Sequence, residues 1–145
     1  MHIPVLLHES IAGLAIKEGG VYVDCTTNRG GHSELIAKAL GQEGTLICID
    51  LDQQALAEAR EKIEKIKNLP KIHFIHSNFR HLPQILKDLK VSHVDGILAD
   101  LGVSSQELDE SGRGFSFRFD EPLLMACDAK PDEDMTTAYD IVNLW

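Results

Sequence analysis

Residues 21–40 read VYVDCTTNRGGHSELIAKAL, and this stretch decides the fold. The apolar run VYVD ends in Asp24, a turn with Gly30 and Gly31 follows, and the apolar spacing of SELIAKAL indicates a helix closed by Gly41. A strand joined to a helix in this way begins a βαβ unit. Because the start of a helix offers unpaired N–H groups, we expect a ligand against the turn.

Three further apolar runs, TLICID, IHFIHS and VDGILAD, alternate with helical patterns. Asp52 is a good N-cap for the second helix, which is predicted to end by Asn68, and Pro83 lies in the first turn of the third. The face of the second helix that is predicted to be buried consists of Leu56, Ala59, Ile63 and Ile66. Strands rich in Val and Ile and linked by helices predict an α/β fold with a doubly wound parallel sheet.

The pattern changes after Leu101, where a long loop-like stretch extends to about residue 135. Thr137 can then cap a last helix. The apolar side of that helix consists of Ala138, Ile141, Val142 and Trp145. An open sheet edge and an uncovered apolar helix are features that proteins rarely leave bare, so we expect a homo-oligomer formed through them.

The charge of the chain limits the ways in which it can bind nucleic acid. The 145 residues carry 14 basic and 23 acidic side chains, a net charge of −9. This is the wrong sign for holding a polyanion by bulk electrostatics, because such binding depends on neutralised phosphates. Any contact with RNA must therefore be local or come from a partner.

The cysteines and histidines favour neither a disulfide framework nor a metal site. Cys25, Cys48 and Cys127 are odd in number and have no CxxC spacing, which is typical of a reducing compartment. His73 and His76 point to opposite faces of their strand. The N-terminus lacks a signal-peptide pattern, and no segment reaches the roughly 18 apolar residues of a membrane span. We expect a cytoplasmic protein with no membrane contact.

The residues at the strand ends suggest which ligand the turn receives. Ligands of open α/β sheets bind outside the carboxyl ends of the strands. Those ends carry Asp24, Asp50, Asn78 with Phe79, and Asp100. The turn is neither GxGxxG nor GxxxxGK[ST], so a pyrophosphate site is poorly supported.

A ligand with a carboxylate, an ammonium, a sulfonium and a ribose fits these acids better, and S-adenosylmethionine is such a ligand. On this interpretation the backbone of Gly30 and Gly31 approaches the amino-acid part. Asp50 accepts both ribose hydroxyls, and Phe79 covers the adenine face.

The sequence resembles a known family through HIPVLLHES, DCTTNRGGHS, ICIDLD, SNFRHL, VDGILADLGVSSQELD and RGFSFRFDEPLLMACD. In order and spacing these motifs resemble the bacterial 16S ribosomal RNA cytosine-N4 methyltransferases of the MraW type. The resemblance implies a class I methyltransferase fold, Rossmann-like, with S-adenosylmethionine as methyl donor. It also implies that the acceptor is the exocyclic amine of a cytidine in 16S rRNA of the small ribosomal subunit.

The resemblance also implies which residues bind the donor. They are Gly30, Gly31, His32, Asp50, Phe79, Asp100 and Glu107. The chain departs from the family pattern at Asn28, where a glycine is common, and at Thr27, where the family has an apolar residue. Glu107 replaces a neutral amide, and Leu124 and Ala126 replace an acid and an arginine. The acid at position 107 changes the expected contact to the donor.

The domain organisation expected from the resemblance is one S-adenosylmethionine-binding domain over residues 1–145, the N-terminal part of the family's fold. Family members continue with an inserted helical domain for RNA and with the remaining strands of the sheet. We therefore expect the parallel sheet to be incomplete.

Asp100 is the candidate catalytic residue, because an acid near the expected methyl group could orient the cytosine amine and take its proton. Ser104 and Ser105 are secondary acceptors. In GRGFSFRF, residues 112–119, arginines alternate with phenylalanines. That segment is either a platform on which a base of single-stranded RNA stacks or a lid whose phenylalanines pack onto the sheet.

Two other functions remain open from the sequence. The chain could be a noncatalytic relative that binds S-adenosylmethionine and transfers nothing. It could also be a nucleotide-dependent oxidoreductase, although the missing GxGxxG disfavours this class.

Overall fold

The computed structural model describes residues 6–103, 108–109, 112–128 and 135–144. The chain divides into two compact units, Met1–Asp100 and Leu101–Trp145. The expectation of a single domain over residues 1–145 stays a prediction. Glu107, Ser104 and Ser105 lie outside the described residues, so nothing tests their expected roles.

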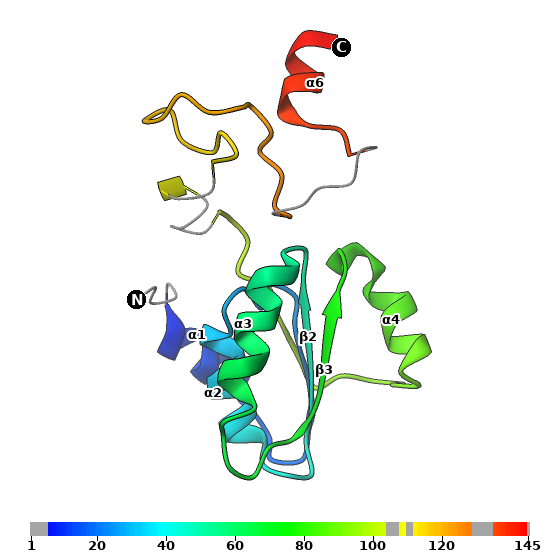
Figure 1. Cartoon of the computed structure of the whole chain (residues 1–145). Helices are drawn as coiled ribbons and strands as arrows, with labels where there is room; N and C mark the ends of the chain where they lie inside the picture. The colour runs from blue at the N-terminus through cyan, green and yellow to red at the C-terminus, as the bar shows by residue number, and fades with distance from the viewer. Residues whose placement is uncertain (1–5, 104–107, 110–111, 129–134, 145) are drawn as a thin grey trace. The chain divides into compact units, whose positions relative to one another are not determined.

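The first unit alternates strands and helices (Figure 1). Its elements are α1 (Leu7–Leu14), β1 (Val21–Asp24), α2 (Gly31–Leu40), β2 (Thr45–Asp50), α3 (Gln53–Ile63), β3 (Lys71–His76), the 3₁₀ helix η1 (Phe79–His81), α4 (Leu82–Asp88) and β4 (Gly96–Leu98). The predicted alternation of strands with helices is confirmed.

The four strands form one sheet in the order β3-β2-β1-β4, and every pair is parallel. Val23 of β1 pairs with Ile47 of β2 on one side and with Ile97 of β4 on the other. The chain runs outward from β1 to β3 and then returns to the far side of β1. Strand order therefore reverses between β1 and β4, which is where ligands bind in open α/β sheets.

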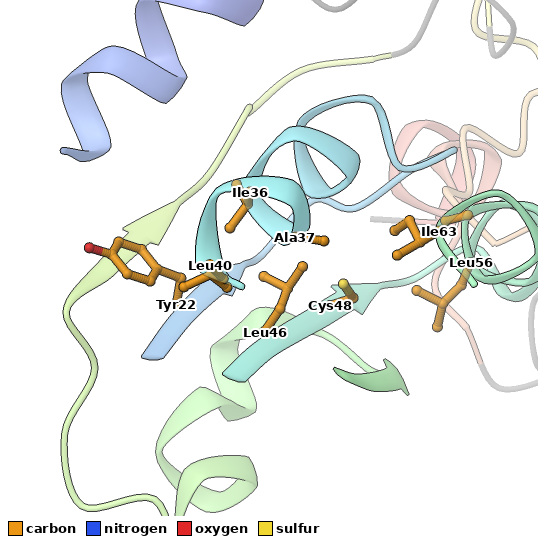
Figure 2. Close-up of a cluster of buried hydrophobic side chains, with 9 residues drawn as sticks. Tyr22, Ile36, Ala37, Leu40, Leu46, Cys48, Leu56 and Ile63 are labelled. Carbon is orange, nitrogen blue, oxygen red and sulfur yellow. The ribbon is translucent and has the colours of Figure 1, made fainter. Parts of the chain in front are cut away.

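The sheet buries a different cluster on each face. Because side chains alternate along a strand, Tyr22 and Cys48 pack with α2 and α3, whereas Val23 and Ile49 pack on the face that carries Ile85 of α4. Figure 1 shows α2 and α3 on one side of the sheet and α4 on the other, and Figure 2 shows the first cluster. Helices thus cover both faces, as the doubly wound prediction requires.

The helix ends follow the predicted capping residues in two cases and differ in a third. Asp52 caps α3, since its carboxylate accepts the N–H groups of Gln54 and Ala55 at 2.9 and 3.1 Å. Gly41 ends α2 with a φ of 66°. However, α3 ends at Ile63, so the expected place of Ile66 on the helix is wrong. Ile66 nevertheless packs against the same cluster from the segment that follows.

In the second unit, Thr137 caps α6 (Ala138–Leu144) as predicted. Its hydroxyl donates to Asp140 at 2.7 Å, and the N–H of Asp140 points back to it at 3.3 Å. Ile141 and Val142 of the expected apolar face are exposed, and Trp145 lies outside the described residues. The expected self-association through this helix and the sheet edge stays a prediction.

Within the described ranges of the chain, every helix falls short of the apolar length that a bilayer crossing requires.

Ile47 of β2 and Ile97 of β4 both pair with Val23 of β1 but differ in burial, so they test the description of the core. Ile47 has no exposed surface, whereas Ile97 is 49% exposed. Ile47→Ala is expected to lower the free energy of unfolding by about 2–5 kcal/mol, because it leaves a cavity between β2 and α4. Ile97→Ala removes the same atoms and is expected to cost about 1 kcal/mol or less. Urea unfolding measures both, and equal losses would contradict the described burial.

Candidate functional site

The strand ends named from the sequence lie along one edge of the sheet. All strands are parallel, so Asp50 at the end of β2, Phe79 after β3 and Asp100 after β4 all lie at carboxyl ends on the same edge. The strand order places Asp50 and Asp100 on either side of the turn that follows β1. The structure therefore brings Asp50, Phe79 and Asp100 to the edge at which the turn with Gly30, Gly31 and His32 begins α2, while their roles stay predictions.

Asp24, the last residue of β1, is completely buried and does not line the edge as a free acid. Its carboxylate accepts the Ser33 hydroxyl at 2.6 Å and the Thr26 N–H at 3.1 Å. Burial raises the pKa of the Asp24 carboxyl, and the hydrogen bond from Ser33 opposes this rise. Asp24 thus ties the first turn of α2 to the end of β1.

The turn between β1 and α2 owes its shape to residues with positive φ. Asn28 has a φ of 46°, and Gly30, the N-cap of α2, has a φ of 73°. A Cβ on Gly30 would lie 3.1 Å from the Cβ of Ala59 and 3.2 Å from Cδ1 of Ile63. Gly30 is therefore required both for its conformation and for close packing of the turn on α3.

The turn also explains two departures from the family pattern. Asparagine tolerates the left-handed region better than other residues with a side chain, so Asn28 can occupy a position where glycine is common. Thr27 is buried, but its hydroxyl donates to the carbonyl of Asp24 at 3.3 Å. Both residues fit the backbone conformation and burial of this turn.

Asp50 holds the turn from the neighbouring strand. Its Oδ2 accepts the N–H of Asn28 at 2.6 Å, and its Oδ1 accepts the N–H of Asp52 at 2.8 Å. These bonds fix the Asp50 carboxylate beside the turn, and a carboxylate is the kind of acceptor that ribose hydroxyls need. The interpretation of Asp50 as a ribose acceptor fits this geometry.

His32 gives the clearest sign of a missing partner. Its side chain is 5% exposed in the first turn of α2. Among the described residues, its Nε2 is the buried side-chain nitrogen or oxygen that lacks a hydrogen-bond partner. Buried polar atoms are normally satisfied, so a ligand or water at this turn is the expected partner. The imidazole, and not only the backbone, is thus a candidate ligand contact.

Phe79 and Asp100 are both exposed at the edge. Phe79 opens η1 and keeps 41% of its surface exposed, as a ring that receives a base must. Asp100 follows β4, and its N–H donates to Oγ1 of Thr26 at 2.7 Å. The sequence reasoning missed Thr26 and Ser33, although both hydroxyls lie within nine residues of the acid that ends β1.

In the second unit, hydrogen bonds connect the segment at residues 112–119 to a later part of the same unit. Arg113 is buried, and its Nη1 donates to the carbonyls of Ala126 and Cys127 at 2.7 and 2.6 Å. The suggestion that Arg113 alternates with phenylalanines on an RNA-facing platform is therefore wrong for this residue. Phe117 and Phe119 are exposed, and base stacking and lid packing both remain open for them.

Leu124 and Ala126, the two other residues that depart from the family pattern, belong to the part of the second unit that Arg113 contacts. The N–H of Leu124 donates to the carbonyl of Arg113 at 3.2 Å, and the small side chain of Ala126 is buried. For metals, no group of three or more His, Cys, Asp or Glu side chains with suitable geometry is found in the part of the chain that the structure describes.

Asn28 tests the conformation of the turn. Asn28→Ala is expected to lower the free energy of unfolding by about 1 kcal/mol, because alanine does not favour the left-handed region. Asn28→Gly is expected to be neutral or stabilising for the same reason. Thermal unfolding of both variants measures the difference, and a Gly variant less stable than the Ala variant would contradict the role of the left-handed backbone conformation at this position.

Asp24 makes stability depend on pH with a known sign. Its raised pKa means that the folded protein holds the proton more tightly than the unfolded chain, so stability is lost as pH rises from the unfolded pKa through the folded one. Asp24→Asn removes this loss. Compared with the parent protein, the variant is expected to be relatively more stable at pH 8 than at pH 4. Urea unfolding at both pH values measures this, and an opposite trend would contradict the buried ionisable group.

Comparison of the sequence with known proteins identifies the family of the chain. The whole chain, residues 1–145, matches the model of the MraW methylase family. The chain is 49% identical over 144 residues to ribosomal RNA small subunit methyltransferase H of Brevibacillus brevis. The aligned residues cover 99% of this chain and 44% of that protein. The chain therefore spans less than half the length of this curated relative.

Two solved structures share the fold. A proposed rRNA-methylase of Clostridium thermocellum aligns with a TM-score of 0.50 at 19% identity, over 58% of this chain and 46% of that one. A protein-L-isoaspartate O-methyltransferase aligns with a TM-score of 0.53 at 15% identity, over 68% and 29%. They confirm the class I methyltransferase fold. Because the family model matches every residue, the chain belongs to the MraW methylase family.

Proposed function

We propose that this chain binds S-adenosylmethionine and forms the donor-binding part of a methyltransferase that acts on the N4 amine of a cytidine in 16S rRNA, in the cytoplasm. The observation that carries the proposal is the family match over all 145 residues. The name of the Brevibacillus brevis relative supports the small ribosomal subunit as the substrate. The site supports it through the acids and the exposed ring at one edge of the sheet.

Each part of the donor has a matching group at that edge. The start of α2 suits the carboxylate of the amino-acid part, because its N–H groups and the helix dipole favour negative charge. His32 Nε2, which lacks a partner among the described residues, is proposed as a further contact to the same part of the donor. Asp50 is placed to accept ribose hydroxyls, and the exposed Phe79 ring is placed to cover the adenine. Glu107 is proposed as a further contact from the resemblance alone.

Asp100 is the group proposed to act on the acceptor. The cofactor supplies a methyl group activated by a sulfonium, and the protein must orient the attacking amine in line with it. The lone pair of cytosine N4 is delocalised into the ring, so an acceptor for the developing positive charge promotes attack. Asp100 is exposed beside the reversal of strand order, which leaves its carboxylate accessible to an amine.

A noncatalytic S-adenosylmethionine-binding module is the second candidate. The observations that favour it are the net charge of −9, which opposes binding to RNA, and Ala126, which stands where the resemblance implies an arginine. The same donor site serves both candidates. They differ only in whether methyl transfer follows binding.

Calorimetric titration with S-adenosylmethionine tests the donor site. Asp50→Asn is expected to weaken binding by roughly ten- to a hundredfold, because a charged hydrogen-bond acceptor for the ribose is lost. Asp52→Asn is the matched control: it lies two residues away, serves as a helix cap that asparagine replaces well, and is expected to stay within about threefold. Equal effects of the two substitutions would contradict the assignment of Asp50.

Methyl transfer to small ribosomal subunits decides between the two candidates. Binding followed by transfer to a cytidine supports the methyltransferase, and binding without transfer supports the noncatalytic module. A chain that folds but does not bind S-adenosylmethionine would contradict both.

A further inference from the structure

The hydroxyl of Thr26 joins β1 to the chain that leaves β4. The last backbone bond between these strands runs from the N–H of Cys25 to the carbonyl of Leu98 at 2.8 Å. In a regular parallel ladder, the N–H of Asp100 would next donate to the carbonyl of Cys25. It donates instead to Oγ1 of Thr26, at 2.7 Å. A side chain thus replaces the main chain at the point where strand order reverses.

Thr26 is itself held from the interior. Its N–H donates to Oδ1 of Asp24 at 3.1 Å, and Oδ2 of Asp24 accepts the Ser33 hydroxyl at 2.6 Å. Asp24 and Ser33 have no exposed surface, so this end of the hydrogen-bond series is fixed by packing. The series runs from the first turn of α2 through a buried carboxylate to the backbone of Asp100.

We propose that Thr26 is a positioning residue, whose hydroxyl sets where Asp100 lies relative to the donor-binding turn at residues 25–30. The inference rests on the proposed function, in which Asp100 borders the bound donor and orients the acceptor amine. Asp50 anchors the turn from β2, and Thr26 anchors β4 to the same turn. The two acids are therefore placed on opposite sides of one short segment, Asp50 through its bond to Asn28 and Asp100 through its bond to Thr26.

A merely structural role for Thr26 makes different predictions. If the hydroxyl only closed the end of the sheet, its loss would change global stability and would leave the environment of Asp100 unchanged apart from unfolding. If it positions Asp100, its loss changes the local protection of that residue in a protein that remains folded. Serine keeps the acceptor oxygen, so it restores the contact, whereas valine has nearly the same shape and cannot accept a hydrogen bond.

The test uses Thr26→Val, Thr26→Ser and Thr45→Val in the full chain. Thr45 begins β2 at the amino end of the sheet and serves as the matched control. Amide hydrogen exchange followed by NMR reports on Asp100 directly. In Thr26→Val, exchange of the Asp100 amide is expected to be faster by about three- to tenfold, the loss of one net hydrogen bond, while core amides of β2 keep their rates. Thr26→Ser and Thr45→Val are expected to match the parent protein.

Calorimetry with S-adenosylmethionine connects the contact to the site. Thr26→Val is expected to weaken donor binding by about three- to tenfold, with recovery in Thr26→Ser. Unchanged Asp100 exchange in Thr26→Val, or equal acceleration of all amides, would overturn the inference. So would unchanged donor binding in a variant whose Asp100 amide has lost protection. If the parent protein itself does not bind the donor, the proposed function fails, a result distinct from failure of the Thr26 contact.

Discussion

The structure depends on β1 having a parallel partner on each side. Because β2 and β4 both pair with it in the same direction, the carboxyl ends of all the strands lie at one edge, and the chain reverses its order beside β1. The burial of Tyr22 and Val23 on opposite faces keeps this strand in the centre. The positions of Asp50 and Asp100 follow from that placement, since the turn after β1 lies between the ends of its two neighbours.

Polar contacts stabilise the turn, and the loss of such a contact would leave a buried polar group without a hydrogen-bond partner and lower the stability of the fold. A buried carboxylate lowers stability unless it is hydrogen-bonded, and Asp24 receives a hydroxyl and an N–H within the protein. Asp50 takes the N–H of Asn28 from the other side, and Arg29 pairs with Glu58 of α3 at 2.5 Å. The segment is thus held from β1, from β2 and from α3. This preorganisation leaves its backbone less entropy to lose when a ligand binds.

Local features of the fold were predictable from the sequence, and contacts between distant segments were not. The caps at Asp52 and Thr137 follow from side chains that bond to backbone within three residues. The end of α3 was missed because Ile66 continues the apolar pattern after the helix has stopped. The inward path of Arg113 depends on carbonyls far along the chain, and the Thr26 contact depends on β4, so no local pattern indicates either. The place of Phe79 and Asp100 at the edge was predictable, because strand ends can be recognised in the sequence and the carboxyl ends of parallel strands lie at one edge.

The central claim is that one edge of the sheet, on both sides of β1, receives the donor. The most direct measurement is the change in backbone amide chemical shifts as S-adenosylmethionine is added to the isotope-labelled chain. The account predicts that the largest shifts gather at residues 26–32, 50–52, 79 and 100. Shifts gathered at the opposite edge, around Gly20, Gly44 and Asp95, would contradict it.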